Sequence, residues 1–218
     1  LGYVGPAVLD QLLLNKKYSV TGIDAGYFYK KKIFNKYSKK ITTIFKDVRN
    51  IGQNDLVGFN KIVYLAAISN DPMGNVFGKV THEINFQSAI KIAKLAKNNG
   101  ITKFIYASSC SMYGFTKNLI KSEKSKLNPL TDYAKSKVKA EKKLKNLTTN
   151  KFKVISLRFA TACGFSENMR LDLVLNDFVA SAISTKEVKV LSDGSPWRPL
   201  IHIKDMARAI NWALDENK

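Results

Sequence analysis

The sequence predicts an α/β fold in which a doubly wound, mostly parallel sheet is covered by helices. Short strand-like segments alternate with longer segments of helical period, an acid ends the first strand, and a serine-rich turn directly follows a later one. A chain of 218 residues with 45% hydrophobic residues is long enough to bury one sizeable core. We therefore expect one large domain with a small appendage.

The N-terminal third is expected to form a helix and three strands. Residues 5–15 have a helical pattern, YSVTGID at 18–24 is typical of a strand, and residues 41–47 form a weaker strand. KIVYLAA at 61–67 is an unbroken apolar run, which suits a strand buried on both faces. The basic stretch at 28–40 (FYKKKIFNKYSKK) is the most irregular part of the chain, and no element is expected in it.

Helices and strands continue to alternate in the middle of the chain. A helical period runs over 80–99 and ends at Gly100, a residue typical of helix C-termini. KFIYAS at 103–108 and KVISLRF at 153–159 are typical of strands, and between them 132–147 forms a Lys-rich amphipathic helix.

The regular alternation of strand-like and helix-like segments ends near residue 165. Beyond it we expect helices at 171–184 and 205–214 and short strands at 188–191 and 200–203. Residues 1–165 are therefore assigned to the larger domain. Residues 166–218 are assigned to part of a smaller region, some segments of which return to the core of the larger one.

The chain is strongly basic, with 36 Lys and Arg against 17 Asp and Glu and a formal charge of +19. Such a charge can indicate nucleic-acid binding. The lysines are scattered in short clusters, however, and aromatic residues do not interleave with them as a base-stacking surface requires. We favour a Lys-rich surface and expect no nucleic-acid partner.

The sequence lacks the patterns that are typical of membrane, secreted and metal-binding proteins. No apolar run approaches the ~20 residues of a membrane span, and no signal peptide is recognisable. Cys110 and Cys163 are far apart, and neither they nor His82 and His202 have metal-ligand spacing. We expect no membrane association, no metal and a cytoplasmic location.

The N-terminus carries part of a dinucleotide-binding pattern. Gly2, Tyr3, Val4 and Gly5 precede the first helix, and Asp24 closes the next strand, 19 residues after Gly5 (24 − 5). Glycines allow the backbone to approach a pyrophosphate at a helix N-terminus, and an acid about 20 residues later can hold ribose hydroxyls. Because a carboxylate repels a 2′-phosphate, Asp24 favours NAD over NADP. Two glycines alone could also form an ordinary turn and helix cap.

A candidate catalytic pair lies on the Lys-rich helix. Tyr133 and Lys137 are four residues apart, which places both side chains on one helix face. A nearby ammonium stabilises a phenolate, so that tyrosine can exchange protons near neutral pH. Ser109 follows directly on an apolar strand, where its hydroxyl can orient a substrate oxygen at the sheet edge. The alternatives are a surface helix for the pair and a turn or helix cap for the serine.

At these residues the chain resembles the NAD-dependent epimerase/dehydratase family of the extended short-chain dehydrogenase/reductase superfamily, most of all its UDP-glucose 4-epimerases and 4-ketosugar reductases. The resemblance covers essentially the whole chain. It rests on GYVG (2–5), Asp24, DV (47–48), LAA (65–67), Asn85, SSCSMYG (108–114), YAKSK (133–137), LRFATACG (157–164) and SDGSPWRPLIHIKDMA (192–207). It implies a Rossmann-type NAD-binding domain over 1–165 and a partial substrate-binding region over 166–218. It also implies a chain truncated at both ends, without the first strand and first glycine of the family.

The resemblance also implies roles for individual residues. Tyr133 corresponds to the acid/base, Lys137 to its activator and ribose partner, and Ser109 to the residue that binds the 4-oxygen of the sugar. Cofactor contacts are implied for Gly2, Tyr3, Val4, Gly5, Asp24, Asp47, Val48, Leu65, Ala66, Ala67, Asn85, Ser108, Tyr133, Lys137 and Phe159. Substrate contacts are implied for Ser69, Ser109, Ser111, Thr161 and Arg198, with Arg198 on the diphosphate.

Two departures from the family pattern narrow the activity. Cys110 and Ser111 stand where 4,6-dehydratases carry an acidic pair, so a dehydratase is disfavoured, and the sugar-nucleotide decarboxylases are disfavoured on similar grounds. Ser69 stands where 4-epimerases often have a lysine. The leading hypothesis is an isomerase that epimerises carbon 4 of a UDP-sugar with NAD.

Two alternatives remain open. One is an NAD(P)H-dependent reductase of 4-ketosugar nucleotides, which would use the same residues. The other, from a different class, is a non-catalytic member of the fold that binds NAD or nucleic acid. By resemblance, we also expect a homodimer formed through the helices at 80–99 and 132–147.

Overall fold

The computed structural model describes residues 1–14, 16–28, 30–69, 73, 76–115, 120–194 and 197–216. The chain forms two compact units, each assembled from stretches that are separate in the sequence. Unit 1 comprises Leu1–Gly22, Gly26–Ile44 and Phe159–Asn211, and unit 2 comprises Ile23–Ala25, Phe45–Arg158 and Trp212–Lys218. The assignment of a cofactor domain and a substrate region on either side of residue 165 stays a prediction.

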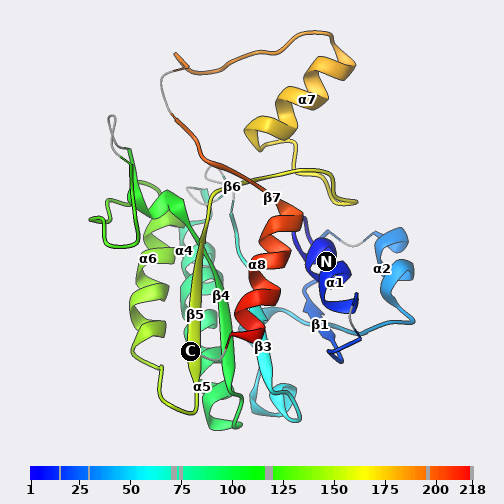
Figure 1. Cartoon of the computed structure of the whole chain (residues 1–218), viewed down its shortest axis with the longest axis vertical. Coiled ribbons are helices and arrows are strands. Elements are labelled where there is room, and N and C mark those ends of the chain that lie inside the picture. The colour runs from blue at the N-terminus through cyan, green and yellow to red at the C-terminus, as the bar shows by residue number, and fades with distance from the viewer. Residues whose placement is uncertain are drawn as a thin grey trace. The chain divides into compact units, whose positions relative to one another are not determined.

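Unit 2 is built on a sheet of three strands. Strands β3 (Lys61–Tyr64), β4 (Lys103–Ser109) and β5 (Lys153–Phe159) lie in that order (Figure 1). β3 and β4 are parallel. The consecutive residues Phe104 and Ile105 are both fully buried although they point to opposite faces, so β4 is covered on both sides.

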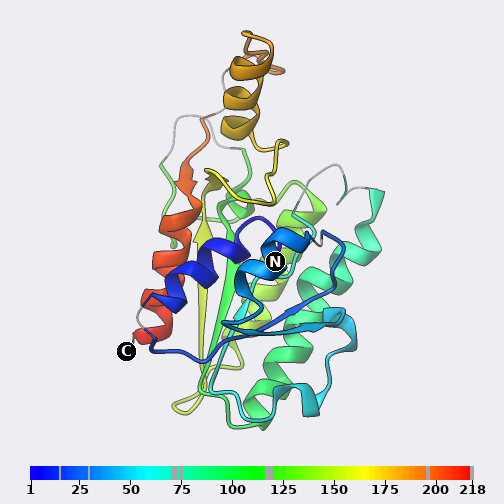
Figure 2. The same ribbon diagram turned by 90° about the vertical axis from the view of Figure 1, so that its right-hand side faces the viewer.

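The helices of unit 2 cover this sheet. They are α4 (Gly78–His82), the π-helical segment Glu83–Ser88, α5 (Ala89–Asn98) and α6 (Asp132–Lys145). Figure 2 shows α5 and α6 on the same side of the sheet, where they pack against one another. Ala93 and Ala140 are fully buried, and small residues such as these let helices approach closely. The hydroxyl of Thr131 caps α6 by accepting a hydrogen bond from the N–H of Ala134, 3.2 Å away.

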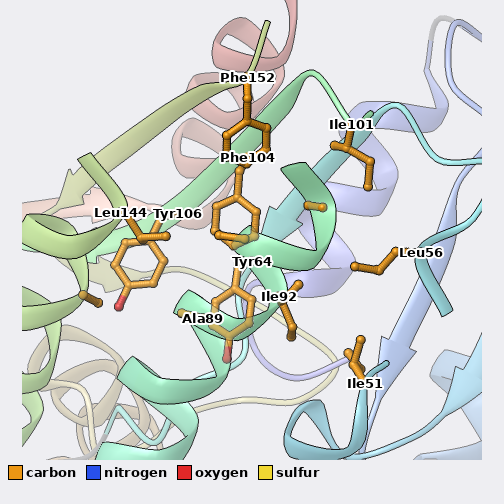
Figure 3. Close-up of a cluster of buried hydrophobic side chains, with 13 residues drawn as sticks. Ile51, Leu56, Tyr64, Ala89, Ile92, Ile101, Phe104, Tyr106, Leu144 and Phe152 are labelled. Carbon is orange, nitrogen blue, oxygen red and sulfur yellow. The ribbon is translucent and has the colours of Figure 1, made fainter. Parts of the chain in front are cut away.

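A cluster of aromatic and aliphatic side chains forms the core of unit 2 (Figure 3). Its buried members are Ile51, Leu56, Tyr64, Ala89, Ile92, Ala93, Ala96, Ile101, Phe104, Tyr106, Ala140, Leu144 and Phe152. The ring of Tyr64 stacks with those of Phe104 and Tyr106, with centroids 5.9 and 6.0 Å apart. Both tyrosine hydroxyls donate to the π-helical segment, Tyr64 to the carbonyl of Ile84 (2.7 Å) and Tyr106 to that of Asn85 (2.9 Å). The sheet and the π-helical segment are therefore joined by hydrogen bonds as well as by packing.

Unit 1 holds a second, smaller core. Its helices are α1 (Gly5–Leu13), α2 (Lys31–Tyr37), α7 (Val174–Ser184) and most of α8 (Ile203–Asp215). β1 (Thr21–Asp24) pairs with β2 (Thr42–Phe45); Thr21, Gly22 and residues 42–44 of these strands are in unit 1, and the rest are in unit 2. β6 (Thr161–Cys163) runs parallel to β7 (Leu200–His202). The buried residues of its core are Leu9, Ile33, Tyr37 and Ile41. At the end of β6, Gly164 has φ +110°, and a Cβ there would lie 2.3 Å from the ring of His202, so only glycine fits.

The expected α/β fold with parallel sheets is confirmed, and most elements lie where the sequence predicts them. The expectation of no element at 28–40 was wrong, because Ile33 and Tyr37 lie one turn apart and are both 1% exposed, which gives α2 a buried face. The prediction of a strand at 188–191 was also wrong. Val188, Val190 and Leu191 are exposed there and belong to no regular element.

Smaller differences concern the ends of elements. The expected helix at 80–99 is interrupted by the π-helical segment, and the strand expected at 61–67 ends at Tyr64. The helix expected at 5–15 ends at Leu13, and residue 15 lies outside the described part of the chain, as do residues 195 and 196 of the segment 192–207. Among the described residues, no helix has both the length and the apolar character needed to cross a bilayer.

Candidate active site

The first turns of α6 bring Tyr133 and Lys137 together. The Nζ atom of Lys137 lies 5.5 Å from the centroid of the Tyr133 ring and 4.7 Å from that of Tyr106. It donates a hydrogen bond to the carbonyl of Ala107, 2.7 Å away. Lys137 is only 2% exposed, so its ammonium is enclosed by the two rings and the end of β4.

This enclosure changes the acidity of the lysine. Burial disfavours the charged form and lowers the pKa of Lys137 from 10.5 to about 7. The group beside the Tyr133 ring can therefore gain or lose a proton near neutral pH. Such a pair has the properties required for acid/base chemistry at a substrate hydroxyl.

Ser109 lies at the same end of β4. It is the last residue of the strand and the N-cap of a short 3₁₀ turn, Cys110–Tyr113, where its Oγ accepts a hydrogen bond from the N–H of Ser111 (3.2 Å). Since Lys137 binds the carbonyl of Ala107, two residues before Ser109, all three expected catalytic residues are anchored near the carboxyl end of β4. The assignment of these three residues to one catalytic site stays a prediction.

The turn after Ser109 holds a polar atom that lacks a partner. The Oγ of Ser111 is buried and forms no hydrogen bond with any residue that the structure describes. A buried hydroxyl in this state gains free energy when a ligand supplies a hydrogen bond. Its position, two residues after Ser109, is compatible with the predicted role in substrate binding.

Asn85 joins the π-helical segment to two other parts of unit 2. Its amide exchanges two hydrogen bonds with the backbone of Ile68, both 2.9 Å long, and donates a third to the hydroxyl of Ser136 (3.2 Å). Asn85 is completely buried. Its side chain therefore fixes the segment that follows β3 and the turn of α6 between Tyr133 and Lys137, while a direct cofactor contact stays a prediction.

The other expected residues of unit 2 lie at the ends of strands or in the segments that follow them. Asp24 ends β1, and Asp47 is held by Arg49, whose Nη2 lies 2.8 Å from its carboxylate. Val48 begins the short turn after Asp47 and packs against the core. Leu65, Ala66 and Ala67 are half-buried after β3, Ser69 is exposed, and Ser108 is buried with its hydroxyl donating to Glu141 (3.1 Å).

The glycine turn belongs to unit 1. At Gly2 and Gly5 an added Cβ would meet no atom within 4 Å, so the packing of the protein itself does not require glycine there. Helix α1 starts at Gly5 with no side-chain cap and no acid in its first turn. Open space above the N-terminus of a helix suits a pyrophosphate, so the residues present fit NAD, with Pro6 as the one position of the first turn that provides no N–H. Tyr3 is buried between the two glycines, and its hydroxyl donates to the carbonyl of Gly164 (2.7 Å).

Three expected residues lie in the remaining part of unit 1. Phe159 is the buried last residue of β5, and Thr161 begins β6. The N–H of Thr161 donates to the carbonyl of Pro199 (3.0 Å), which places Thr161 close to the backbone that follows the exposed Arg198. Thr161 and the Arg198 segment are thus brought together by the pairing of β6 and β7.

Sequence reasoning missed Glu141 and Arg158, which form an ion pair in unit 2 through two nitrogens of the guanidinium. A signal was available, because Glu141 follows Lys137 by four residues and so lies on the same face of α6. No group of three or more metal-ligating side chains is found among the residues described.

Comparison with known proteins identifies the family of the chain. The model of the NAD dependent epimerase/dehydratase family matches residues 1–218. The chain is 28% identical over 227 residues to the Bacillus subtilis (strain 168) protein named "Uncharacterized UDP-glucose epimerase YtcB", covering 98% of this chain and 70% of that protein. It is 24% identical to the "Putative UDP-glucose 4-epimerase" of Methanocaldococcus jannaschii, covering 97% and 71%.

Solved structures share the fold. The UDP-N-acetylglucosamine 4-epimerase of Methanobrevibacter ruminantium M1, in complex with UDP-N-acetylmuramic acid, matches with a TM-score of 0.90 at 24% identity, over 100% of this chain and 71% of that chain. The dTDP-glucose 4,6-dehydratase DesIV of Streptomyces venezuelae matches with a TM-score of 0.88 at 21% identity, over 100% and 70%. The same fold therefore occurs in isomerases and in lyases that act on nucleotide sugars.

Proposed function

The chain belongs to the NAD-dependent epimerase/dehydratase family, and we propose that it inverts the configuration at carbon 4 of a UDP-sugar. The observation that carries this proposal is the Tyr133–Lys137 pair at the carboxyl end of β4, with the enclosed ammonium 5.5 Å from the tyrosine ring. Two relatives that carry UDP-glucose epimerase names support the choice of a UDP-sugar.

Bound NAD would supply the hydride acceptor and donor for carbon 4, which allows the hydrogen to leave one face and return to the other. Tyr133 takes the proton of the 4-hydroxyl and later gives it back. Lys137 stabilises the phenolate between these steps, and the hydroxyl of Ser109 orients the oxygen of the sugar. Gly2, Gly5 and Asp24 would hold the diphosphate and ribose of the cofactor, and Arg198 and Thr161 would contact the substrate.

The residues after Ser109 favour epimerisation over dehydration. A 4,6-dehydratase has to move protons at carbons 5 and 6, for which the family uses an acidic pair, and this chain has Cys110 and Ser111 there. A reductase of 4-ketosugar nucleotides remains the second candidate, because Ser69 replaces the lysine that is frequent in 4-epimerases.

The test is to incubate the protein and a catalytic amount of NAD with UDP-glucose deuterated at carbon 4. An epimerase yields UDP-galactose that keeps the deuterium and consumes no net cofactor. A reductase instead oxidises one NADH for each ketosugar nucleotide supplied. If the protein formed no UDP-galactose and did not bind UDP-glucose, the proposal would be rejected.

We also propose that the protein is a homodimer. The supporting feature is a shallow groove on the helices at 83–95, lined by Phe86, Gln87, Ile90, Lys91, Lys94 and Leu95. Sedimentation equilibrium measures the mass in solution directly. A purely monomeric mass over the accessible concentration range would contradict this proposal.

A further inference from the structure

The face of α6 that carries the proposed catalytic pair continues into Glu141. Tyr133, Lys137 and Glu141 are spaced by four residues, so they occupy successive turns of one face. Lys137 donates to the carbonyl of Ala107, and Glu141 accepts a hydrogen bond from the hydroxyl of Ser108. The helix is thus attached to β4 at two consecutive residues, directly before Ser109.

Arg158 on β5 completes these connections. Its Nε and Nη2 atoms both donate to Oε1 of Glu141, at 3.0 and 2.7 Å, and Nε also lies 3.2 Å from Oε2. Its Nη1 donates to the hydroxyl of Tyr113 (2.7 Å) and to the carbonyl of Glu123 (3.1 Å). Tyr113 ends the 3₁₀ turn that Ser109 begins, so a single guanidinium joins β5, α6 and that turn.

The pair is enclosed enough to hold its geometry. The side chains of Arg158 and Glu141 are 17% and 20% exposed. Exposed ion pairs contribute little, whereas a pair of low exposure that is joined by two guanidinium nitrogens restricts the orientation of both partners. Because the two charges compensate each other at close range, their effect on Lys137 and Ser109 is mainly geometric.

We propose that Glu141 and Arg158 are positioning residues that hold the Tyr133–Lys137 face of α6 in register with Ser109 and its turn. This inference rests on the proposed function, since it concerns the efficiency of that site. Neither residue needs to touch the substrate or the cofactor. Their loss should therefore reduce turnover more than substrate binding.

The experiment compares Arg158→Lys, Glu141→Gln and the double variant in UDP-glucose epimerisation. Arg158→Lys keeps the positive charge but has one nitrogen in place of the three that bind Glu141 and Tyr113. For each single variant we expect kcat to fall about tenfold to a hundredfold, while the KM for UDP-glucose stays within about twofold. Because the two residues act as one unit, the double variant should lose no more than the worse single variant.

Asp55→Asn is the matched control. It removes a carboxylate from another half-buried ion pair of unit 2, in which Lys46 lies 2.7 Å from Asp55, and it should leave kcat unchanged. Folded Glu141 and Arg158 variants with kcat within about twofold of the wild type, or additive losses in the double variant, would overturn the proposal.

Two further measurements test the same inference by other means. If the charge variants do not fold, Tyr113→Phe can be used, because it removes only one acceptor of Arg158. It should lower kcat about threefold, and an unchanged kcat would overturn the inference. If the wild type does not turn over UDP-sugars, the proposed function fails separately. The positioning role is then tested by comparing amide exchange in Arg158→Lys and in the wild type. Faster exchange at residues 108–113 in the variant supports this role, and unchanged exchange rejects it.

Discussion

Lys137 shows how a single buried residue links the stability of this protein to its proposed chemistry. The folded protein releases the ammonium proton near pH 7, whereas the unfolded chain keeps it up to about 10.5. A proton bound more tightly by the unfolded chain makes the free energy of unfolding rise with pH. The cost of enclosing this ammonium is therefore full below about pH 7 and is relieved as the pH rises toward 10.5.

We predict that Lys137→Met is most favourable for stability, relative to the wild type, at low pH. Between pH 7 and 10 the difference in the free energy of unfolding should shift toward the wild type by about 1 kcal/mol per pH unit. Urea titrations at several pH values measure it. Lys139→Met, on the exposed side of the same helix, is the control, and a difference for Lys137→Met that does not change with pH would contradict the prediction.

At the scale of single residues, the sequence predicted contacts between residues that are close along one helix. Tyr133 and Lys137 are on one helix, so their meeting follows from their separation of four residues. Glu141 shares that spacing, but its partner Arg158 lies on a strand 17 residues further along the chain. Because such a contact depends on how α6 and β5 pack, the sequence alone did not reveal the pair.

Among the elements, the π-helical segment Glu83–Ser88 has the most consequences for the site. It presents the amide of Asn85 to the backbone of Ile68 and to Ser136, and its carbonyls accept from Tyr64 and Tyr106. A single turn of π-helix inside an α-helix often marks a functional position. The helical period at 80–99 predicted a continuous helix and gave no sign of this interruption.

We predict that Asn85→Ala lowers the free energy of unfolding by about 1–3 kcal/mol, because it leaves the part-buried N–H and carbonyl of Ile68 without their partners and removes a fully buried side chain. Chemical denaturation measures the loss. Asn98→Ala, at the exposed end of α5, should change stability by no more than about 0.5 kcal/mol. Equal effects of the two substitutions would show that the Asn85 bridge contributes nothing.

The sequence predicted elements well where one face is plainly apolar and failed where burial depends on distant partners. The strand at 103–108 was expected almost to the residue, since its apolar run is buried on both faces. By contrast, α2 was not predicted, because its sequence is rich in lysine and only Ile33 and Tyr37 form its buried face. The apolar residues at 188–191 resemble a strand but pair with none in the described part of the chain.

On the scale of the whole molecule, the residues with expected roles are divided between the two units. The glycine turn, Thr161 and Arg198 belong to unit 1, and the catalytic residues belong to unit 2. Within unit 1, the amide of Asn176 donates to the hydroxyl of Tyr3 (2.9 Å) and accepts from the N–H of Gly164 (3.0 Å). The glycine turn is thereby tied to the segment between β6 and α7.

We predict that Tyr3→Phe loosens this segment. Without the hydroxyl, the carbonyl of Gly164 and one N–H of Asn176 lose a partner, and amide exchange at residues 164–176 should become faster. Strand β4, in unit 2, serves as the internal reference. Tyr27→Phe, which alters a tyrosine that is 73% exposed, is the control variant. Unchanged exchange at 164–176 would mean that this bridge does not stabilise the segment.

In the proposed mechanism, Tyr133 is the group that moves the proton of the 4-hydroxyl. Rapid mixing of NAD-loaded protein with UDP-glucose, for the wild type and for Tyr133→Phe, follows reduction of the cofactor and formation of UDP-galactose within one turnover. We predict that Tyr133→Phe binds UDP-glucose as the wild type does but reacts at least about 100-fold more slowly. A Tyr133→Phe protein that reacts at the wild-type rate would contradict the account.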